Sequence, residues 1–144
     1  MKKLDIDIFN ERIHCISLGK LTKEVVDFIV EKHPDYKRVL STEQDILFWK
    51  DRVAHTEKHR DDFLPDIQYL TCLEEIPKIL KKPDYIGIHP KDSSISFIKD
   101  FNQHVAVAIR ISATGKLSYR TMYPLMDAQL ENYIKRNRAW AFEK

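Results

Sequence analysis

The sequence predicts an α+β domain in which N-terminal helices pack on one face of a C-terminal antiparallel four-stranded meander sheet, followed by a terminal helix. Apolar residues recur at helical spacing upstream of Pro83. Downstream of Pro83, four segments have the length and residue types of strands. Short turn signals join these segments, so each strand is expected to lie antiparallel to the next.

The composition fits one domain spanning residues 1–144. The chain is 43% hydrophobic and 32% charged, which allows a sizeable core. Lys and Arg number 24 against 22 Asp and Glu, so the net charge of +2 does not by itself predict a polyanionic partner. Any nucleic-acid site must therefore be a local basic patch.

The cysteines and the apolar segments exclude several classes of protein. Cys15 and Cys72 form no CxxC pair and predict neither a zinc site nor a disulfide framework. Charges interrupt the N-terminal segment, which excludes a standard signal peptide, and no apolar run is long enough to span a membrane. We therefore expect a cytoplasmic protein without a membrane partner, and no cofactor is implied.

The first half of the chain predicts a hairpin and three helices. Residues 4–9 and 12–18 are two extended segments that could pair as the hairpin. Thr22 begins a helix that stops before Pro34. Ser41 or Thr42 caps a longer helix that reaches about Phe63. A third helix covers residues 73–81. The predicted core positions of the long helix are Ile46, Trp49 and Val53.

The second half predicts the sheet and the terminal helix. The expected strands are Tyr85–His89, 95–101, His104–Ile111 and 117–123, and the helix covers residues 126–136. The strand His104–Ile111 has one fully apolar face. Its other face carries His104, Ala106, Ala108 and Arg110, which would form a shallow trough for a ligand or a plain outer face with a surface arginine.

Hydroxyl groups alternate along the last predicted strand. Tyr119, Thr121 and Tyr123 would project from one face of a regular strand, which suits a ligand surface. The alternative is a half-exposed edge strand of ordinary β-forming residues. Lys99, at the end of the second strand, could stabilise charge on a phosphate or could simply be a surface lysine.

His55 and His59 are four residues apart and would share a helix face. Glu57 follows the first histidine by two positions, so neither HExxH nor HxxEH is present and a metalloprotease is excluded. Histidine titrates near neutral pH, so two on one face suit metal-free acid–base chemistry. The alternative is a pair of solvated histidines on a charged helix.

Several segments, taken in order, resemble a known nuclease family. They are His55 and His59 on a helix, Pro83-Asp84-Tyr85-Ile86-Gly87, Ser94-Ile95-Ser96-Phe97-Ile98-Lys99, Ala108-Ile109-Arg110 and Arg120-Thr121-Met122-Tyr123-Pro124. Together they resemble the phage-associated nuclease domains grouped with barnase, EndoU, colicin-type and RelE-like ribonucleases. The resemblance covers residues 41–137 and leaves residues 1–40 as an N-terminal hairpin and helix extension.

The resemblance implies a metal-independent endoribonuclease that uses the ribose 2′-hydroxyl as nucleophile. His55 or His59 would act as base and acid, Lys99 and Arg110 would hold the phosphate, and Thr121 and Tyr123 would contact the nucleotide. His89 and His104 are reserve candidates for proton transfer or RNA contact. Because arginine stays protonated, Arg110 is limited to electrostatic stabilisation.

Two classes of function follow from these residues. The first is an RNA-cleaving toxin or a phage or mobile-element effector, with RNA such as tRNA as substrate and an immunity or antitoxin protein as a further partner. The second is a non-catalytic RNA- or protein-binding module that keeps the nuclease fold. Such a module would hold a strand by stacking and phosphate contact, through Tyr119, Tyr123 and the basic residues Lys99, Arg110 and Arg120.

Overall fold

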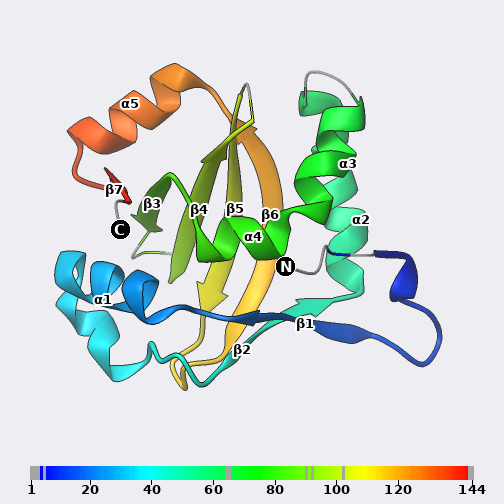
Figure 1. Cartoon of the computed structure of the whole chain (residues 1–144), viewed down its shortest axis with the longest axis horizontal. Coiled ribbons are helices and arrows are strands. Elements are labelled where there is room, and N and C mark those ends of the chain that lie inside the picture. The colour runs from blue at the N-terminus through cyan, green and yellow to red at the C-terminus, as the bar shows by residue number, and fades with distance from the viewer. Residues whose placement is uncertain are drawn as a thin grey trace.

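The computed structural model describes residue 4 and residues 6–63, 66–89, 91, 93–101 and 103–142. Across these residues a twisted sheet forms the centre of the molecule, with α4 crossing in front of it and α2 and α3 beside β6 (Figure 1). The strands are β1 (Cys15–Lys20), β2 (Asp45–Trp49), β3 (Tyr85–His89), β4 (Ser94–Asp100), β5 (His104–Ile111), β6 (Leu117–Leu125) and β7 (Ala139–Ala141).

The described strands form one seven-stranded sheet in the order β1-β2-β6-β5-β4-β3-β7. The predicted meander of β3 to β6 is confirmed, because each of these strands pairs antiparallel with the next. The prediction that the sheet has only four strands is wrong, because three more strands belong to it. β1 and β2 add to one side through a parallel pairing of β2 with β6, and β7 adds to β3 on the other side.

The helices are α1 (Lys23–Lys32), α2 (Asp51–Glu57), α3 (Asp66–Glu74), α4 (Ile76–Lys81) and α5 (Asp127–Lys135). Short 3-10 turns, η1 (Ile6–Ile8), η2 (Pro34–Arg38) and η3 (Arg60–Asp62), complete the described elements. The predicted cap of the first helix is confirmed, since the Thr22 hydroxyl accepts a hydrogen bond from the Val25 amide at 3.2 Å. The terminal helix is confirmed within one residue at each end.

The predicted helix from Ser41 or Thr42 to Phe63 is wrong in its first part. Residues Asp45–Trp49 form β2, because Ile46 and Phe48 alternate along a strand and are both fully buried. Trp49, predicted to face the core, is 45% exposed.

Two smaller predictions also differ from the structure. The N-terminal hairpin is wrong, because β1 pairs with β2 and Ile6–Ile8 is a 3-10 turn. The helix at 73–81 is divided into α3 and α4, with the break at Glu75 and Pro77 in the first turn of α4.

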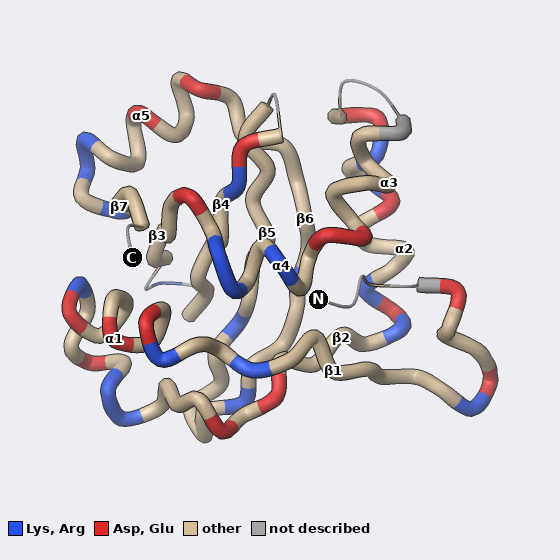
Figure 2. The backbone as a smooth tube through the Cα atoms, in the orientation of Figure 1, with Lys and Arg blue, Asp and Glu red and all other residues tan. Residues whose placement is uncertain are grey.

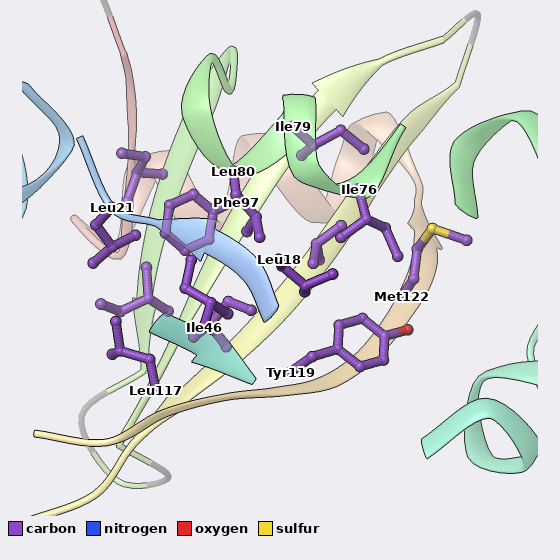
Figure 3. Packing of buried hydrophobic residues seen from close by; sticks show 14 of the residues in the cluster. Leu18, Leu21, Ile46, Ile76, Ile79, Leu80, Phe97, Leu117, Tyr119 and Met122 are labelled. Carbon is purple, nitrogen blue, oxygen red and sulfur yellow. The ribbon is translucent and has the colours of Figure 1, made fainter. Parts of the chain in front are cut away.

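The two faces of the sheet differ in character. We call the side of β5 that carries Val105, Val107, Ile109 and Ile111 the helix-covered face. Ile76, Ile79 and Leu80 of α4 project onto this face, where they are in the same buried cluster as Phe97 and Met122 (Figure 3).

We call the other side, with His104, Ala106, Ala108 and Arg110, the alanine face. One end of it is covered by α5, because Leu130 packs with Ala106, Ile98 and Leu125 in a second, smaller cluster.

A β-bulge interrupts β6 between the two tyrosines that were predicted to share a face. Ile109 pairs with Tyr119 and Ala108 pairs with Thr121, which leaves Arg120 as the extra residue. Tyr119 is therefore directed into the helix-covered face, where it is 1% exposed and stacks on Phe48 with ring centroids 4.2 Å apart. The expected RNA contact of Tyr119 is wrong for this reason.

Candidate active site beside strand β6

Helix α2 lies along the part of β6 that β2 leaves unpaired. β2 pairs with β6 at Leu117 and Ser118, and the chain then turns from Trp49 into α2 (Figure 1). The Arg52 Nε donates a hydrogen bond of 2.8 Å to the Arg120 carbonyl at the bulge. Basic positions occur at both ends of α2 (Figure 2). Arg52 therefore gives the free edge of β6 both a hydrogen-bond donor and a positive charge.

A buried hydroxyl pair fixes the same helix from its inner side. Thr56 is fully buried, and its Oγ1 lies 2.5 Å from the Tyr119 hydroxyl and 2.9 Å from the Arg52 carbonyl. Because Thr56 occupies the inner side, His55 and His59 are left partly exposed along the border of the sheet. The bulge thus contributes a tyrosine that anchors the helix bearing the histidines.

His59 is the centre of the candidate site. Its ring centroid lies 6.1 Å from that of His55 and 6.0 Å from that of Tyr123. Its Nδ1 lies 3.2 Å from a carboxylate oxygen of Asp62, which can orient the imidazole. The predicted pairing of the two histidines is therefore present, and His59 also lies beside Tyr123.

His55 lies in a positively charged environment. Partial burial, followed by the charges of Arg52, Lys58, His59 and Arg120, lowers the pKa of His55 below its usual 6.5. This imidazole is therefore neutral at physiological pH and can accept a proton.

Tyr123 lies between His59 and Ser96, a buried polar residue on the alanine face. Burial raises the pKa of Tyr123, which a hydrogen bond with Ser96 opposes in part, so the phenol stays protonated and can donate. Ser96 is 2% exposed, and its Oγ lies 3.1 Å from His89 Nε2. His89 packs edge-on against Tyr133 of α5 at 5.7 Å. His59, Tyr123, Ser96 and His89 thus form a continuous series of contacts.

Thr121 and Arg110 border this series on neighbouring strands. Thr121 is paired with Ala108, and its buried Oγ1 has no hydrogen-bond partner among the described residues. Arg110 is exposed and pairs across the strands with Ser94 and Ser118. The Thr121 hydroxyl is therefore a buried polar group without a partner in the described part of the chain, next to the small side chain of Ala108.

A groove of about 750 Å³ opens between η3 and the start of α5. It is lined by His59, Asp62, Gln103, Tyr123, Pro124, Leu125, Met126, Asp127, Ala128 and Gln129. The acid–base pair of His59 and Asp62 therefore faces a space large enough for a nucleotide-sized ligand.

Lys99 lies on the other face of the sheet from Arg110, although the two were predicted to hold the phosphate together. It pairs with Val105, on the helix-covered face, whereas Arg110 is on the alanine face. Its Nζ lies 3.0 Å from the Lys82 carbonyl and 3.3 Å from the Asp84 carboxylate. The strict alternation of β4, which gives Lys99 the same side as Phe97, is the physical reason.

The remaining predicted residues lie around the same face. His104 is at the start of β5, with Nδ1 2.8 Å from the Asp127 carboxylate and its ring edge-on to Tyr85 at 5.9 Å. Arg120 is the bulge residue, and its charge acts on His55. His104 is thus a hydrogen-bond partner of Asp127 in α5. Arg120 lies close enough to His55 for its charge to act on that ring.

Sequence reasoning did not identify Asp62 and Ser96. Asp62 follows His59 by three residues, a spacing that brings side chains together in a helical turn. Ser96 interrupts the apolar residues Ile95 and Phe97 in a strand, and this alternation was a visible signal for a polar group on the second face.

Comparison with known protein families identifies the family of the chain. A family described as phage-Barnase-EndoU-ColicinE5/D-RelE like nuclease3 matches residues 25–132. The chain belongs to this nuclease family. The resemblance found in the sequence is confirmed, and the match begins at Val25 in α1, upstream of the predicted boundary at residue 41. No curated protein and no solved structure matches the chain.

Among the residues that the structure describes, two kinds of feature are absent. No described helix has the length and apolar character needed to cross a membrane. Among the same residues, no group of three or more His, Cys, Asp or Glu side chains is placed to hold a metal ion.

Proposed function

We propose that the protein is an endoribonuclease that cleaves RNA by attack of a ribose 2′-hydroxyl on the adjacent phosphate. The observation that carries the proposal is the position of His59, between the Asp62 carboxylate at 3.2 Å and the Tyr123 ring at 6.0 Å, at the border of the groove. A neutral imidazole, His55, lies beside it at 6.1 Å. Two histidines of different environment suit a reaction that needs one base and one acid.

His55 is the base in this scheme. It takes the proton of the 2′-hydroxyl as the O2′–P bond forms, and its lowered pKa keeps it unprotonated at neutral pH. His59 is the acid and gives a proton to the O5′ leaving group as the P–O5′ bond breaks. The Asp62 carboxylate, 3.2 Å from His59 Nδ1, orients the His59 ring for this step. The products are a 2′,3′-cyclic phosphate and a 5′-hydroxyl.

Charge that develops on the phosphate needs donors that are already in place. The Arg120 side chain supplies positive charge close to His55, and the exposed Arg110 supplies it on the alanine face. Tyr123 donates through its protonated phenol.

The test is incubation of the purified protein with total tRNA in the presence of EDTA, followed by analysis of the new RNA ends. We expect fragments with 2′,3′-cyclic phosphates. An oligonucleotide with one 2′-deoxy residue at the cleaved position should stay intact, because its nucleophile is missing. His59→Ala should lower the rate by about 10²- to 10⁴-fold, the usual contribution of an acid–base group.

Lys99→Ala is the matched control, because Lys99 is a cation on the opposite face of the same sheet. It should cleave at the wild-type rate. Cleavage of the 2′-deoxy substrate would contradict the proposed nucleophile. RNA that stays intact at every protein concentration but still binds would replace the proposal with a non-catalytic RNA-binding module.

A further inference from the structure

We propose that Trp49 is a stacking site for a base of single-stranded RNA, next to the cleavage site. This inference rests on the proposed function and names a contact that lies outside the acid–base groups. Trp49 is 45% exposed, although tryptophan is usually largely buried in a folded domain. A large exposed aromatic side chain next to a proposed RNA site needs a physical explanation.

The alternation of β2 determines which way Trp49 is directed. Ile46 and Phe48 are fully buried, and Phe48 stacks on Tyr119 at 4.2 Å on the helix-covered face. Trp49 follows Phe48 in the strand and therefore lies on the opposite side, with the alanine face. The indole is thus on the same face of the sheet as Tyr123, whose ring lies 6.0 Å from that of His59.

The strand register places Trp49 next to the bulge. β2 runs parallel to β6 with Leu47 aligned to Ser118, and the Phe48–Tyr119 stack shows that this alignment continues. One further step brings Trp49 level with Arg120. Adjacent strands are about 4.8 Å apart, so the indole lies one strand away from a residue whose charge reaches His55.

The charges around the indole favour nucleic acid as the ligand. Trp49 lines a hollow of about 460 Å³ together with His14, Lys50 and Asp51. Lys50 Nζ lies 3.3 Å from the Asn10 carbonyl, which holds this cation beside the hollow. Arg52 and Arg120 add two guanidinium groups on the side toward the histidines. Lys50 and Asp51, which both line the hollow, have opposite charges, so the excess of positive charge comes from the two arginines beside it.

An aromatic plane bordered by cations matches the two components of an unpaired RNA strand. The base can stack on the indole, while the phosphates on either side meet the lysine and arginines. Every base has a flat face, so such a contact binds without strong sequence preference. A strand that crosses β6 at the histidines would reach β2 at Trp49, and the indole would fix its position relative to the cleaved bond.

Fluorescence provides a direct test, because the protein has two tryptophans and Trp140 can be replaced. Trp140→Phe leaves Trp49 as the only emitter; Trp140 lies in β7, aligned with Ile86 and packed against the main core. The ligand is a short 2′-O-methyl RNA, which lacks the attacking hydroxyl. We expect its addition to quench the emission of Trp49 in a saturable manner.

Affinity variants measure the contribution of the indole. Trp49→Ala should weaken binding of labelled 2′-O-methyl RNA by about 5- to 100-fold, the range expected for loss of one base–aromatic stack. Trp49→Phe should recover most of that loss because it keeps an aromatic face. Leu70→Ala is the control, since Leu70 is a similarly exposed apolar residue, at 42%, on α3.

The outcomes separate this inference from the proposed function. RNA cleavage with no quenching, and equal binding by Trp49→Ala and wild type, would overturn the stacking site alone. Quenching and binding without cleavage would overturn the endoribonuclease and keep the stacking site. Binding that is lost equally in Trp49→Phe and Trp49→Ala, with melting temperatures unchanged, would contradict a stacking contact. Quenching by an added protein but by no RNA would identify a protein-binding surface instead and overturn the proposal.

Discussion

The two faces of the sheet use the same strands for opposite purposes. On the helix-covered face, β5 contributes Val105, Val107, Ile109 and Ile111, each nearly or fully buried beneath helices. On the alanine face, the same strand contributes two alanines between a histidine and an arginine. Large side chains fill space and stabilise the fold, whereas the small side chain of Ala106 leaves room for the residues that cover this face, Leu130 and Tyr123. A change on one face should therefore affect stability, and a change on the other should affect activity.

The largest expected effect comes from two neighbours on β4 that point in opposite directions. Phe97→Ala should lower the free energy of unfolding by about 3–5 kcal/mol, because the ring is fully buried in the main core. Ser96→Ala should cost about 1–3 kcal/mol, because His89 and Tyr123 lose a shared buried partner.

Denaturant unfolding measures both changes, and RNA cleavage is assayed on folded protein. Cleavage per folded molecule should be normal in Phe97→Ala and reduced in Ser96→Ala. If both variants keep normal cleavage, the series from Tyr123 to His89 has no part in the reaction.

Arg110 and Lys99 provide a comparison of two cations on opposite faces. Arg110→Ala should lower the cleavage rate by about 10- to 100-fold, as expected when a charged hydrogen-bond donor to phosphate is removed. Lys99→Ala should leave the rate unchanged and cost at most about 1 kcal/mol of stability, because its ion pair with Asp84 is partly exposed. The reverse result would mean that RNA binds on the helix-covered face.

Tyr119 and Tyr123 of β6 lie on opposite faces, and replacing each by Phe removes only a hydroxyl group. Tyr119→Phe should lower the free energy of unfolding by about 0.5–1.5 kcal/mol, because Thr56 loses its hydroxyl partner, with little effect on cleavage. Tyr123→Phe should reduce cleavage, and it should cost less stability than Tyr119→Phe, because Ser96 keeps His89 as a partner. Chemical denaturation and initial rates distinguish the two results, and equal behaviour of the variants would contradict the assignment of the tyrosines to different faces.

The smallest effect concerns pH. The lowered pKa of His55 places the acidic limb of the pH–rate profile below pH 6.5, since the base is active only when unprotonated. Arg52→Gln removes a nearby positive charge, so the pKa of His55 should rise and the limb should move to higher pH. The pKa should remain below 6.5 because burial is the largest cause of the shift. Titration by NMR follows the His55 ring, with Lys99→Gln as the control; a shift to lower pH would contradict the assignment.

The meander was predictable because its strands are separated by clear turn residues. Tyr85–His89 and His104–Ile111 were predicted with their observed bounds. β2 was missed because Asp45–Trp49 leads into α2 through Lys50 without a Gly or Pro to separate the two elements. Its place in the sheet depends on a parallel contact with β6, far away in sequence, which local patterns do not contain.

The sequence allowed many residues of the candidate site to be named, but it did not show on which face of the sheet each of them lies. His55 and His59 lie together as their spacing indicated, even though α2 ends at Glu57 between them. The position of Lys99 could have been inferred from its alternation with Phe97. The direction of Tyr119 could not be inferred, because a bulge depends on how two strands pair. The sequence around Arg120 contains no turn residue that would indicate it.

The bulge at Arg120 also makes β6 sensitive to the number of its residues. Deletion of this one residue would restore regular alternation, so the segment before it would have to exchange faces or shift along β5. Tyr119 would leave Phe48 and Thr56, and the anchor of α2 would be lost together with the histidines it positions. The loss of a single codon could therefore disable the site while every residue implicated in the chemistry is still encoded.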